Sequence, residues 1–256
     1  MPLSARQQEV KDEFIGVRGT WSDVWESILV LDEDYLLAYL DFSAVPFRQN
    51  HLDAKTKEFI FITVDSAATH LFVPGIRAHI RAALAVGASQ DEIMEVLECT
   101  STLGIHAMNV GVPILLDVLT ERGDRTGPAE LDAEQQRIKA AFTANRGYWN
   151  PTWDEMLEVD PHLFEAYSTF SSVPWKHGHL SPLTKELIYI AFDTAATHLY
   201  RVGLKLHIEN ALGYGATPQQ ILEVMEIASV IGVHSVMTSA PILLEEVAAF
   251  EKEGNK

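Results

Sequence analysis

Eight of the ten histidines form four matched pairs, and the two members of each pair are 128 residues apart. Because imidazole titrates near neutral pH, a histidine held inside a protein can donate or accept the proton in a catalytic step. The pairs are His51/His179, His70/His198, His79/His207 and His106/His234. The repetition predicts proton-handling side chains in both halves of the chain.

His79 and His207 lie on the apolar faces of predicted helices. Ile76, His79, Ile80 and Ala83 have the spacing of one helix face, and His207 has equivalent neighbours. A histidine in this position is either a hydrogen-bonded core residue or a catalytic one, and the spacing leaves both interpretations open.

The remaining pairs also have two explanations. His70 and His198 come at the end of a long helix, where their rings either converge on one cavity with His79 and His207 or cap the helix C-terminus.

His106 and His234 follow a glycine in an uncharged helical run, where a buried ring must find a partner or line a cavity. His51 and His179 precede predicted helices and are expected to be structural.

Two carboxylates lie on one face of the long helix in each half, Glu58 with Asp65 and Glu186 with Asp193. Exposed acids are the ordinary explanation. The helix around them is so apolar that its acidic face is expected to point into the protein, where a carboxylate can tune a histidine.

Arg18 and Arg146 are the repeated arginines, and Trp21 and Trp149 follow each of them closely. The planar guanidinium suits bidentate binding of a carboxylate, so these residues are candidates for substrate binding. Surface solvation of the arginines and core packing of the tryptophans are the alternatives.

The sequence has no HxxH or HExxH spacing, no glycine-rich phosphate loop and no GxSxG elbow. We therefore expect no metal and no cofactor, while a metal site assembled from residues distant in the sequence, and with it a metal-dependent enzyme, stays open as an alternative. Glu95, Glu98, Glu223 and Glu226 are expected on a solvated helix face, with a place in a pocket as the alternative.

The 128-residue offset holds without a gap from Leu3/Leu131 to Leu116/Leu244, with roughly forty per cent of these positions identical. The chain is therefore a duplicated domain, with copies at 1–127 and 128–256 that meet in a linker near Gly127.

Each copy is predicted to be helical throughout. Capping boxes begin at Ser89 and Thr217, and Asp32 and Asp160 are N-cap candidates. No segment shows the strict alternation of a strand between turn residues. The expected fold is all-α.

The net charge of −17 and the scattered basic residues argue against nucleic acid and anionic membranes as partners. A small carboxylate substrate remains compatible with this charge. Cys99 is the only cysteine, which excludes an internal disulfide and a CxxC pair, and a cytoplasmic location is expected.

Residues 227–244 carry no formal charge and meet a length criterion for a membrane span. They contain His234 and Pro241 and have acidic flanks, so we expect a helix buried in protein instead.

The segments TKEFIFITVDSAATHLF, GIRAHIRAALAVGASQDEIMEVL and GIHAMNVGVPIL, with their second copies, resemble the carboxymuconolactone decarboxylase family, which includes alkyl hydroperoxidase D. The resemblance covers the larger, C-terminal part of each half. It implies an all-α fold assembled around symmetry axes. A chain with two such units resembles a fused dimer, which implies a homotrimer of six repeats.

The resemblance also implies roles for residues. His79 and His207 match the family's histidine, and Glu58 and Glu186 match its proton-relay glutamate, although two extra residues separate the glutamate from the histidine here.

The redox cysteines of the peroxidase branch are replaced by Phe72 and Gly75, and by Tyr200 and Gly203 in the second copy. Without thiols the chain is not expected to be a thiol peroxidase.

The family's decarboxylases act without a cofactor on lactone acids from aromatic-ring breakdown. The resemblance implies such a lyase, in which an enolate formed by loss of carbon dioxide is protonated by histidine. The catalytic candidates are His79, His207, Glu58, Glu186, His70 and His198, and the substrate-binding candidates are His106, His234, Arg18, Arg146, Trp21 and Trp149. An isomerase of an unsaturated diacid and a non-catalytic trimeric binding or scaffold protein are the alternatives.

Overall fold

The computed structural model describes residues 2–254, and within this range it contains helices and no strand. The predicted all-α fold is confirmed. The chain forms two compact units, Met1–Asp53 with Thr217–Lys256 (the first unit) and Ala54–Ala216 (the second unit). The boundary near Gly127 separates the copies of the sequence, whereas each compact unit takes helices from both copies.

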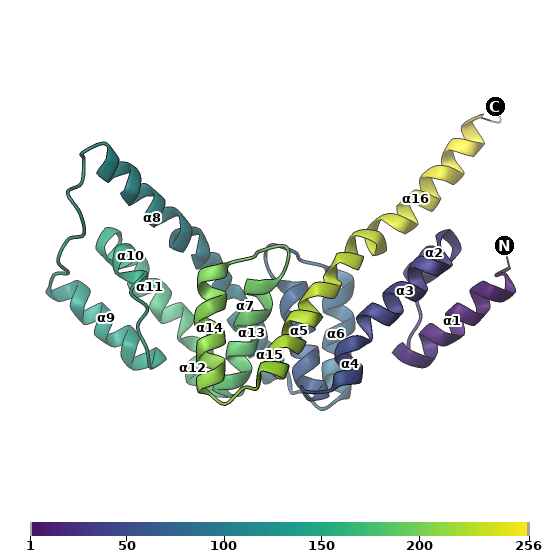
Figure 1. Cartoon of the computed structure of the whole chain (residues 1–256), viewed down its shortest axis with the longest axis horizontal. Helices are drawn as coiled ribbons and strands as arrows, with labels where there is room; N and C mark the ends of the chain where they lie inside the picture. The colour runs from purple at the N-terminus through teal and green to yellow at the C-terminus, as the bar shows by residue number, and fades with distance from the viewer. Residues whose placement is uncertain (1, 255–256) are drawn as a thin grey trace. The chain divides into compact units, whose positions relative to one another are not determined.

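In the first unit the last helix of the second copy packs on the first helices of the first copy. The core of this unit consists of Val10, Phe14, Ile28, Leu29, Leu36, Leu40 and Ala240. Figure 1 shows α16 beside α2. The elements are α1 (Ala5–Arg18), α2 (Asp23–Leu31), α3 (Glu33–Ser43), α4 (Val45–Gln49), α15 (Pro218–Ser229), the 3₁₀ turn η2 (Val230–Gly232) and α16 (Val233–Gly254).

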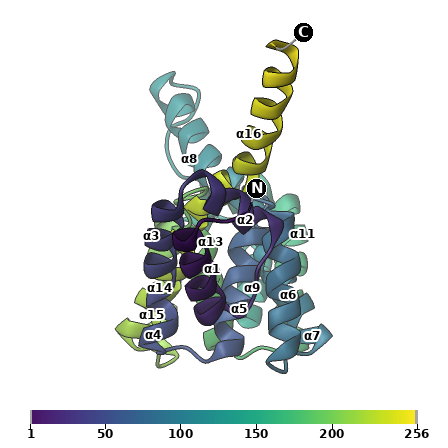
Figure 2. The same ribbon diagram turned by 90° about the vertical axis from the view of Figure 1, so that its right-hand side faces the viewer.

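The second unit is built around two helices, α5 and α13, which pack on each other and are buried on nearly every side. Figure 2 shows α5, α6 and α7 side by side. The elements are α5 (Ala54–Ser66), α6 (Val73–Ala85), α7 (Gln90–Ser101), the 3₁₀ turn η1 (Thr102–Ile105), α8 (His106–Glu121), α9 (Ala133–Arg146), α10 (Trp153–Val159), α11 (Pro161–Ser171), α12 (Val173–His177), α13 (Pro182–Thr194) and α14 (Arg201–Gly213).

The same exchange between copies occurs in the second unit. The last helix of the first copy, α8, packs on α10 of the second copy, and Ile105 and Met108 cover the cluster formed by α9, α10 and α11. That cluster consists of Ile138, Phe142, Met156, Leu157 and Phe164.

The predicted helix starts are confirmed where the structure shows their hydrogen bonds. Ser89 and Thr217 both form complete capping boxes, and Asp32 and Asp160 accept from backbone N–H groups of the first helical turn. These local contacts fix where α3, α7, α11 and α15 begin.

The expectation of a buried helix at 227–244 is right only for its first part. Ile227 to Val233 is largely buried, but Ile242, Leu243 and Val247 of α16 are exposed, because α16 packs along α2 with one side only. By length and composition alone, Gln90–Glu121 and Pro218–Gly254 both qualify as candidate membrane spans, and each is interrupted by a 3₁₀ turn.

A buried ion pair ties α7 to α13. Lys185 Nζ lies 2.8 Å from Glu95 Oε1, and the Glu95 carboxylate also accepts the backbone N–H groups of His179 and Leu180. The expectation that Glu95 and Glu223 are solvated is wrong. Both are buried, because the loop before the next long helix packs over the carboxylate; in the first unit Glu223 accepts from the backbone of residues 51 and 52.

We predict that Glu95→Ala lowers the free energy of unfolding by about 3 kcal/mol or more, because it leaves the Lys185 ammonium buried without its counter-ion. Glu209, which pairs with Lys205 on the surface, provides the control, and Glu209→Ala should leave stability unchanged within error. Urea unfolding followed by circular dichroism measures both. Equal shifts of the two unfolding midpoints would contradict this account of Glu95.

Candidate functional site

A hydrogen-bonded glutamate and histidine lie at the centre of the second unit. His207 Nδ1 on α14 is 2.6 Å from Glu186 Oε2 on α13, and the Asn210 amide lies 3.4 Å from the other carboxylate oxygen. Because the glutamate engages Nδ1, the Nε2 edge of the ring remains for another group. The pair has the arrangement of a general acid oriented by a carboxylate.

The first copy contains the equivalent pair, with His79 Nδ1 2.7 Å from Glu58 Oε2. The two extra residues between glutamate and histidine therefore do not prevent the contact, because α6 packs back along α5. The extra spacing argued against direct partnership of glutamate and histidine, whereas the structure forms the contact in both copies.

The surroundings of the two histidines differ. Phe61 stacks on His79 with ring centroids 4.2 Å apart, whereas Tyr189 takes that place beside His207. The Tyr189 hydroxyl accepts from Trp175 Nε1 at 3.0 Å and from Arg146 Nη1 at 3.3 Å. The site in the second copy therefore contains a phenol and a guanidinium.

Arg146 is a buried cation with no carboxylate at ion-pair distance in the described part of the chain, and Glu186 acts on its charge only from farther away. Its side chain is 6% exposed, it forms no ion pair with any carboxylate of residues 2–254, and its Nε has no hydrogen-bond partner there. The guanidinium lies over the rings of Trp175 and Tyr189. A buried charge of this kind is costly unless a ligand neutralises it, so an anion fits this position.

An inner pocket joins these groups to α8. It leaves about 30 Å³ of free space, enough for a water-sized group. The polar residues that line it include His106, Asn109, Arg146, Tyr148, Tyr167, Tyr189, Tyr200 and His207. Its apolar side is formed by Phe192, Val202 and Leu206.

A wider groove of about 750 Å³ lies next to the inner pocket and shares Asn109, Thr152, Tyr200 and Val202 with it. A volume of this size is typical of small-molecule sites. Because the lining comes from α8 of the first copy and from α9 to α14 of the second, neither copy forms this site alone.

Two buried carboxyl groups lie near the histidine pairs. Burial, and then the negative charge of Glu186, raises the pKa of Asp193 to about 8, and burial raises the pKa of Asp65 to about 7. Asp65 Oδ2 is 4.0 Å from His79 Nε2. The expectation that the acidic faces of α5 and α13 point into the protein is confirmed, since Asp65 and Asp193 are both buried. Because its pKa is raised to about 8, the Asp193 carboxyl group is largely protonated at neutral pH.

The structure brings His106 and His198 together, although they come from different copies. His106 Nδ1 is 2.7 Å from His198 Nε2, and Tyr200 stacks on the His106 ring with centroids 3.9 Å apart. Burial lowers the pKa of His106 to about 3, with the charges of His198 and His207 acting in the same direction, so this ring is neutral.

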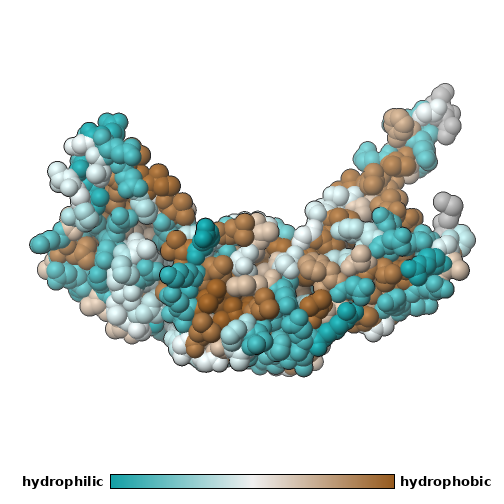
Figure 3. Space-filling view, in the orientation of Figure 1, coloured by the Kyte–Doolittle hydropathy of each residue, from teal (hydrophilic) through white to brown (hydrophobic). Residues whose placement is uncertain are grey.

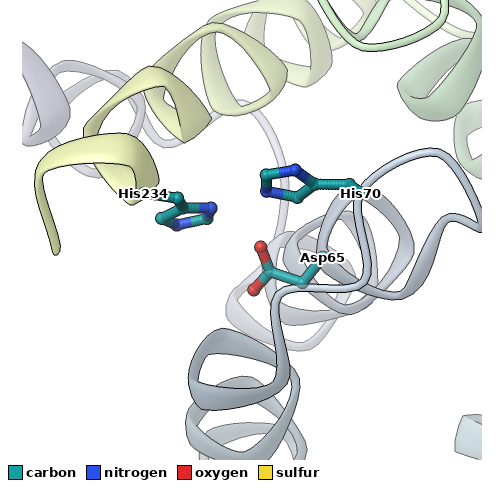
Figure 4. Close-up of side chains that lie close together, drawn as sticks. All are labelled: Asp65, His70 and His234. Atoms are coloured by element: carbon teal, nitrogen blue, oxygen red, sulfur yellow. The ribbon is translucent and has the colours of Figure 1, made fainter. Parts of the chain in front are cut away.

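His70 and His198 lie in the loops that follow α5 and α13, beyond the helix ends, so the helix-cap explanation does not hold. Burial lowers the pKa of both rings. Figure 4 shows the His70 ring near the Asp65 carboxylate, both in the second unit. His234, also labelled there, belongs to α16 of the first unit.

The remaining candidates lie in packed regions. Arg18 donates to Ser43 Oγ and lies over the Phe47 ring, all within the first unit. Trp21 packs on the core of that unit and donates to Glu26, and Trp149 packs on the cluster around Phe142. For the tryptophans this placement agrees with the core-packing alternative.

Sequence reasoning did not select Asn210, which contacts Glu186, or several residues of the pocket: Tyr148, Tyr167, Tyr189, Tyr200 and Asn109. A signal was present in the differences between the copies. Tyr189 and Asn210 replace Phe61 and Ala82 at equivalent positions, and each change adds a polar group beside the repeated histidine.

Comparison with known proteins gives two matches. The model of the carboxymuconolactone decarboxylase family matches residues 33–112 and 161–245, one segment in each copy. A crystal structure from Burkholderia xenovorans LB400, described as a "putative gamma-carboxymuconolactone decarboxylase subunit", is 51% identical to this chain with a TM-score of 0.90. The alignment covers 96% of this chain and 98% of the other. No curated protein matched.

We predict that Gly203→Ala lowers the free energy of unfolding by about 1–3 kcal/mol, because the added methyl group would overlap Asp193 Oδ2 and lie 2.7 Å from the Tyr200 ring. Gly213 lies in the same helix with open space around it, so Gly213→Ala should leave stability unchanged or raise it by up to about 1 kcal/mol. Urea unfolding of both variants tests this. If the two alanines have the same effect, Gly203 does not make room for the carboxyl group.

Proposed function

Because the chain belongs to the carboxymuconolactone decarboxylase family, we propose that it is a carboxy-lyase acting on a small carboxylated lactone or a related ring-cleavage acid. One observation carries the proposal. The buried Arg146 guanidinium, which has no carboxylate partner within residues 2–254, lines the same pocket as His207, whose ring is held by Glu186.

The pocket contains the groups that such a reaction needs. Loss of carbon dioxide leaves an electron pair that must spread onto a neighbouring carbonyl as an enolate. The Arg146 guanidinium and the Tyr189 hydroxyl can stabilise the enolate oxygen, since they lie together at the pocket lining. The protonated His207 ring, held at Nδ1 by Glu186, then supplies its Nε2 proton to the enolate carbon and becomes neutral imidazole, which completes the reaction.

An apolar residue at the junction of the inner pocket and the wider groove suits the departing group. Val202 lines both and offers no hydrogen bond from its side chain, so a carboxylate placed against it in the groove loses part of its hydration and is easier to convert to neutral carbon dioxide. The ring of the substrate would occupy the wider groove, which has the volume for it.

We also propose that the chain assembles as a homotrimer. The side chains of Val110, Ile114, Leu115 and Val118 form an exposed apolar row on α8, visible as the brown stripe along this helix in Figure 3. Rows of this kind mark protein–protein contacts more often than free surface.

We expect His79→Ala combined with His207→Ala to lower kcat/KM by about 10²–10⁴-fold, the usual contribution of a general acid. The substrate is first found by a thermal-shift screen of lactone acids and muconate-like diacids, and turnover is then followed by carbon dioxide release and NMR of the product. His51→Ala is the control and should keep full activity.

Each alternative gives a distinct result in that assay. Conversion of an unsaturated diacid without release of carbon dioxide would identify an isomerase. If no small acid raises the melting temperature while the double variant is strongly destabilised, the scaffold alternative holds. An unchanged kcat/KM would remove both histidines from the mechanism.

Arg146→Met should weaken binding of the carboxylate ligand by about 10-fold or more, because a charge-assisted hydrogen bond is lost. The melting temperature of the ligand-free variant should stay within a few degrees of the parent, since the substitution removes a costly buried charge together with its hydrogen bond to Tyr189, and keeps an apolar side chain of similar length. Arg137→Met, on the surface, is the control for both measurements. Tight ligand binding by Arg146→Met would refute its role.

A further inference from the structure

Three side chains beside the inner pocket take no part in the proposed decarboxylation. These are His106 at the start of α8, Asp193 near the end of α13, and His198 in the loop before α14. His106 Nδ1 lies 2.7 Å from His198 Nε2 and 3.6 Å from Asp193 Oδ1, and one ligand atom of each residue lies within 4.8 Å of the others.

Hydrogen bonding alone does not satisfy this group. One proton between His106 and His198 engages those two nitrogens, but both Asp193 oxygens remain without a hydrogen-bond partner among residues 2–254. Asp193 is fully buried, and a buried carboxyl group left in this way costs free energy. A cation between the three side chains would satisfy the two rings and the carboxylate together.

We infer that His106, Asp193 and His198 bind a divalent first-row transition ion such as Zn²⁺ or Co²⁺. Two imidazole nitrogens and one carboxylate are a common ligand set for these ions, with bonds of about 2.0–2.2 Å. Ligands at that distance lie roughly 3–3.6 Å from one another in tetrahedral or octahedral geometry. The His106–Asp193 separation of 3.6 Å lies in this range, and the two rings, now 2.7 Å apart at a hydrogen-bond distance, would move apart by a few tenths of an ångström to hold the ion. Magnesium and calcium prefer oxygen ligands and fit less well.

The backbone around the group holds these side chains in place. Gly203 has no side chain where the first turn of α14 passes the Asp193 carboxyl group. Leu199, directly after His198, has a φ of 52°, a conformation that a bulky residue adopts only when its surroundings enforce it. His106 also lines the inner pocket, so an ion bound here would lie at the pocket wall.

The sequence keeps the same residue types in both copies. Asp65, His70 and His234 are the counterparts, and Leu71 and Gly75 repeat the backbone features, although roughly sixty per cent of aligned positions differ between the copies. A motif search misses His106, Asp193 and His198 because the three residues come from separate elements. The expectation of no metal depended on the spacing of residues close together in the sequence.

Another group in the second unit, Glu95 with His177 and His179, is not a comparable site. Its carboxylate oxygens already engage Lys185 and two backbone N–H groups, and both rings are exposed. Such a surface pair binds metal ions adventitiously, so the test is made in a His177→Ala, His179→Ala background.

The experiment uses the full-length, untagged, chelator-treated protein in that background, titrated with Co²⁺ and with Zn²⁺. Visible absorption of bound Co²⁺ and calorimetry with Zn²⁺ are the readouts. His106→Ala with His198→Ala should lose one bound ion per chain relative to the background, and Asp193→Asn should weaken binding by about 10-fold or more. His162→Ala, an exposed histidine, should bind as the background does.

A second readout excludes loss of folding as the cause. Asp193→Asn keeps the shape of the side chain, so the variant should fold, and Zn²⁺ should raise the melting temperature of the background more than that of the variant. The inference is overturned if the background binds neither ion, or if the triad variants bind both ions as tightly as the background. No substrate enters these measurements, so they stand apart from the decarboxylase proposal.

Discussion

The structure depends on the burial of charged side chains along α13. This helix is enclosed on nearly all sides, yet it carries Lys185, Glu186 and Asp193 in the interior. An ionised group without water must be paired with a partner or lose its charge. Each of these residues therefore needs a partner side chain on another helix. Lys185 has Glu95 of α7, Glu186 has His207 of α14, and Asp193 faces His106 of α8. The same requirement therefore positions three helices and assembles the candidate site.

Much of the fold was predictable because it follows from local signals. The repeat, the all-α class and the capping boxes at Ser89 and Thr217 depend on residue types within a few positions of one another. The inward acidic face of the long helices was predictable from their apolar composition. The family pattern pointed to Glu58, His79, Glu186 and His207 as candidates, but the two extra residues between glutamate and histidine argued against direct contact, and only the structure shows both hydrogen bonds.

Other features could not be read from the sequence, because they depend on which copy packs against which. The two copies have similar helices at equivalent positions, so periodicity does not reveal that α8 covers the helices of the second copy. His106 lies close to His198 only because α8 packs on the helices of the second copy. Glu95 was expected in solvent because its helix has a polar face, and only the packing of the loop at His179 and Leu180 buries it.

The crossed packing of α8 and α16 has a consequence for how the chain folds. In a protein with a single copy, the helices around Phe142 would obtain their covering helix only from another molecule, and stability would then vary with protein concentration. Joining the copies in one chain makes that association intramolecular. With a short linker, the effective concentration of one copy around the other is in the millimolar range. The fused chain can thus complete both cores at any dilution, and the two copies can diverge in sequence, as Tyr189 in place of Phe61 shows, because each always meets the same partner.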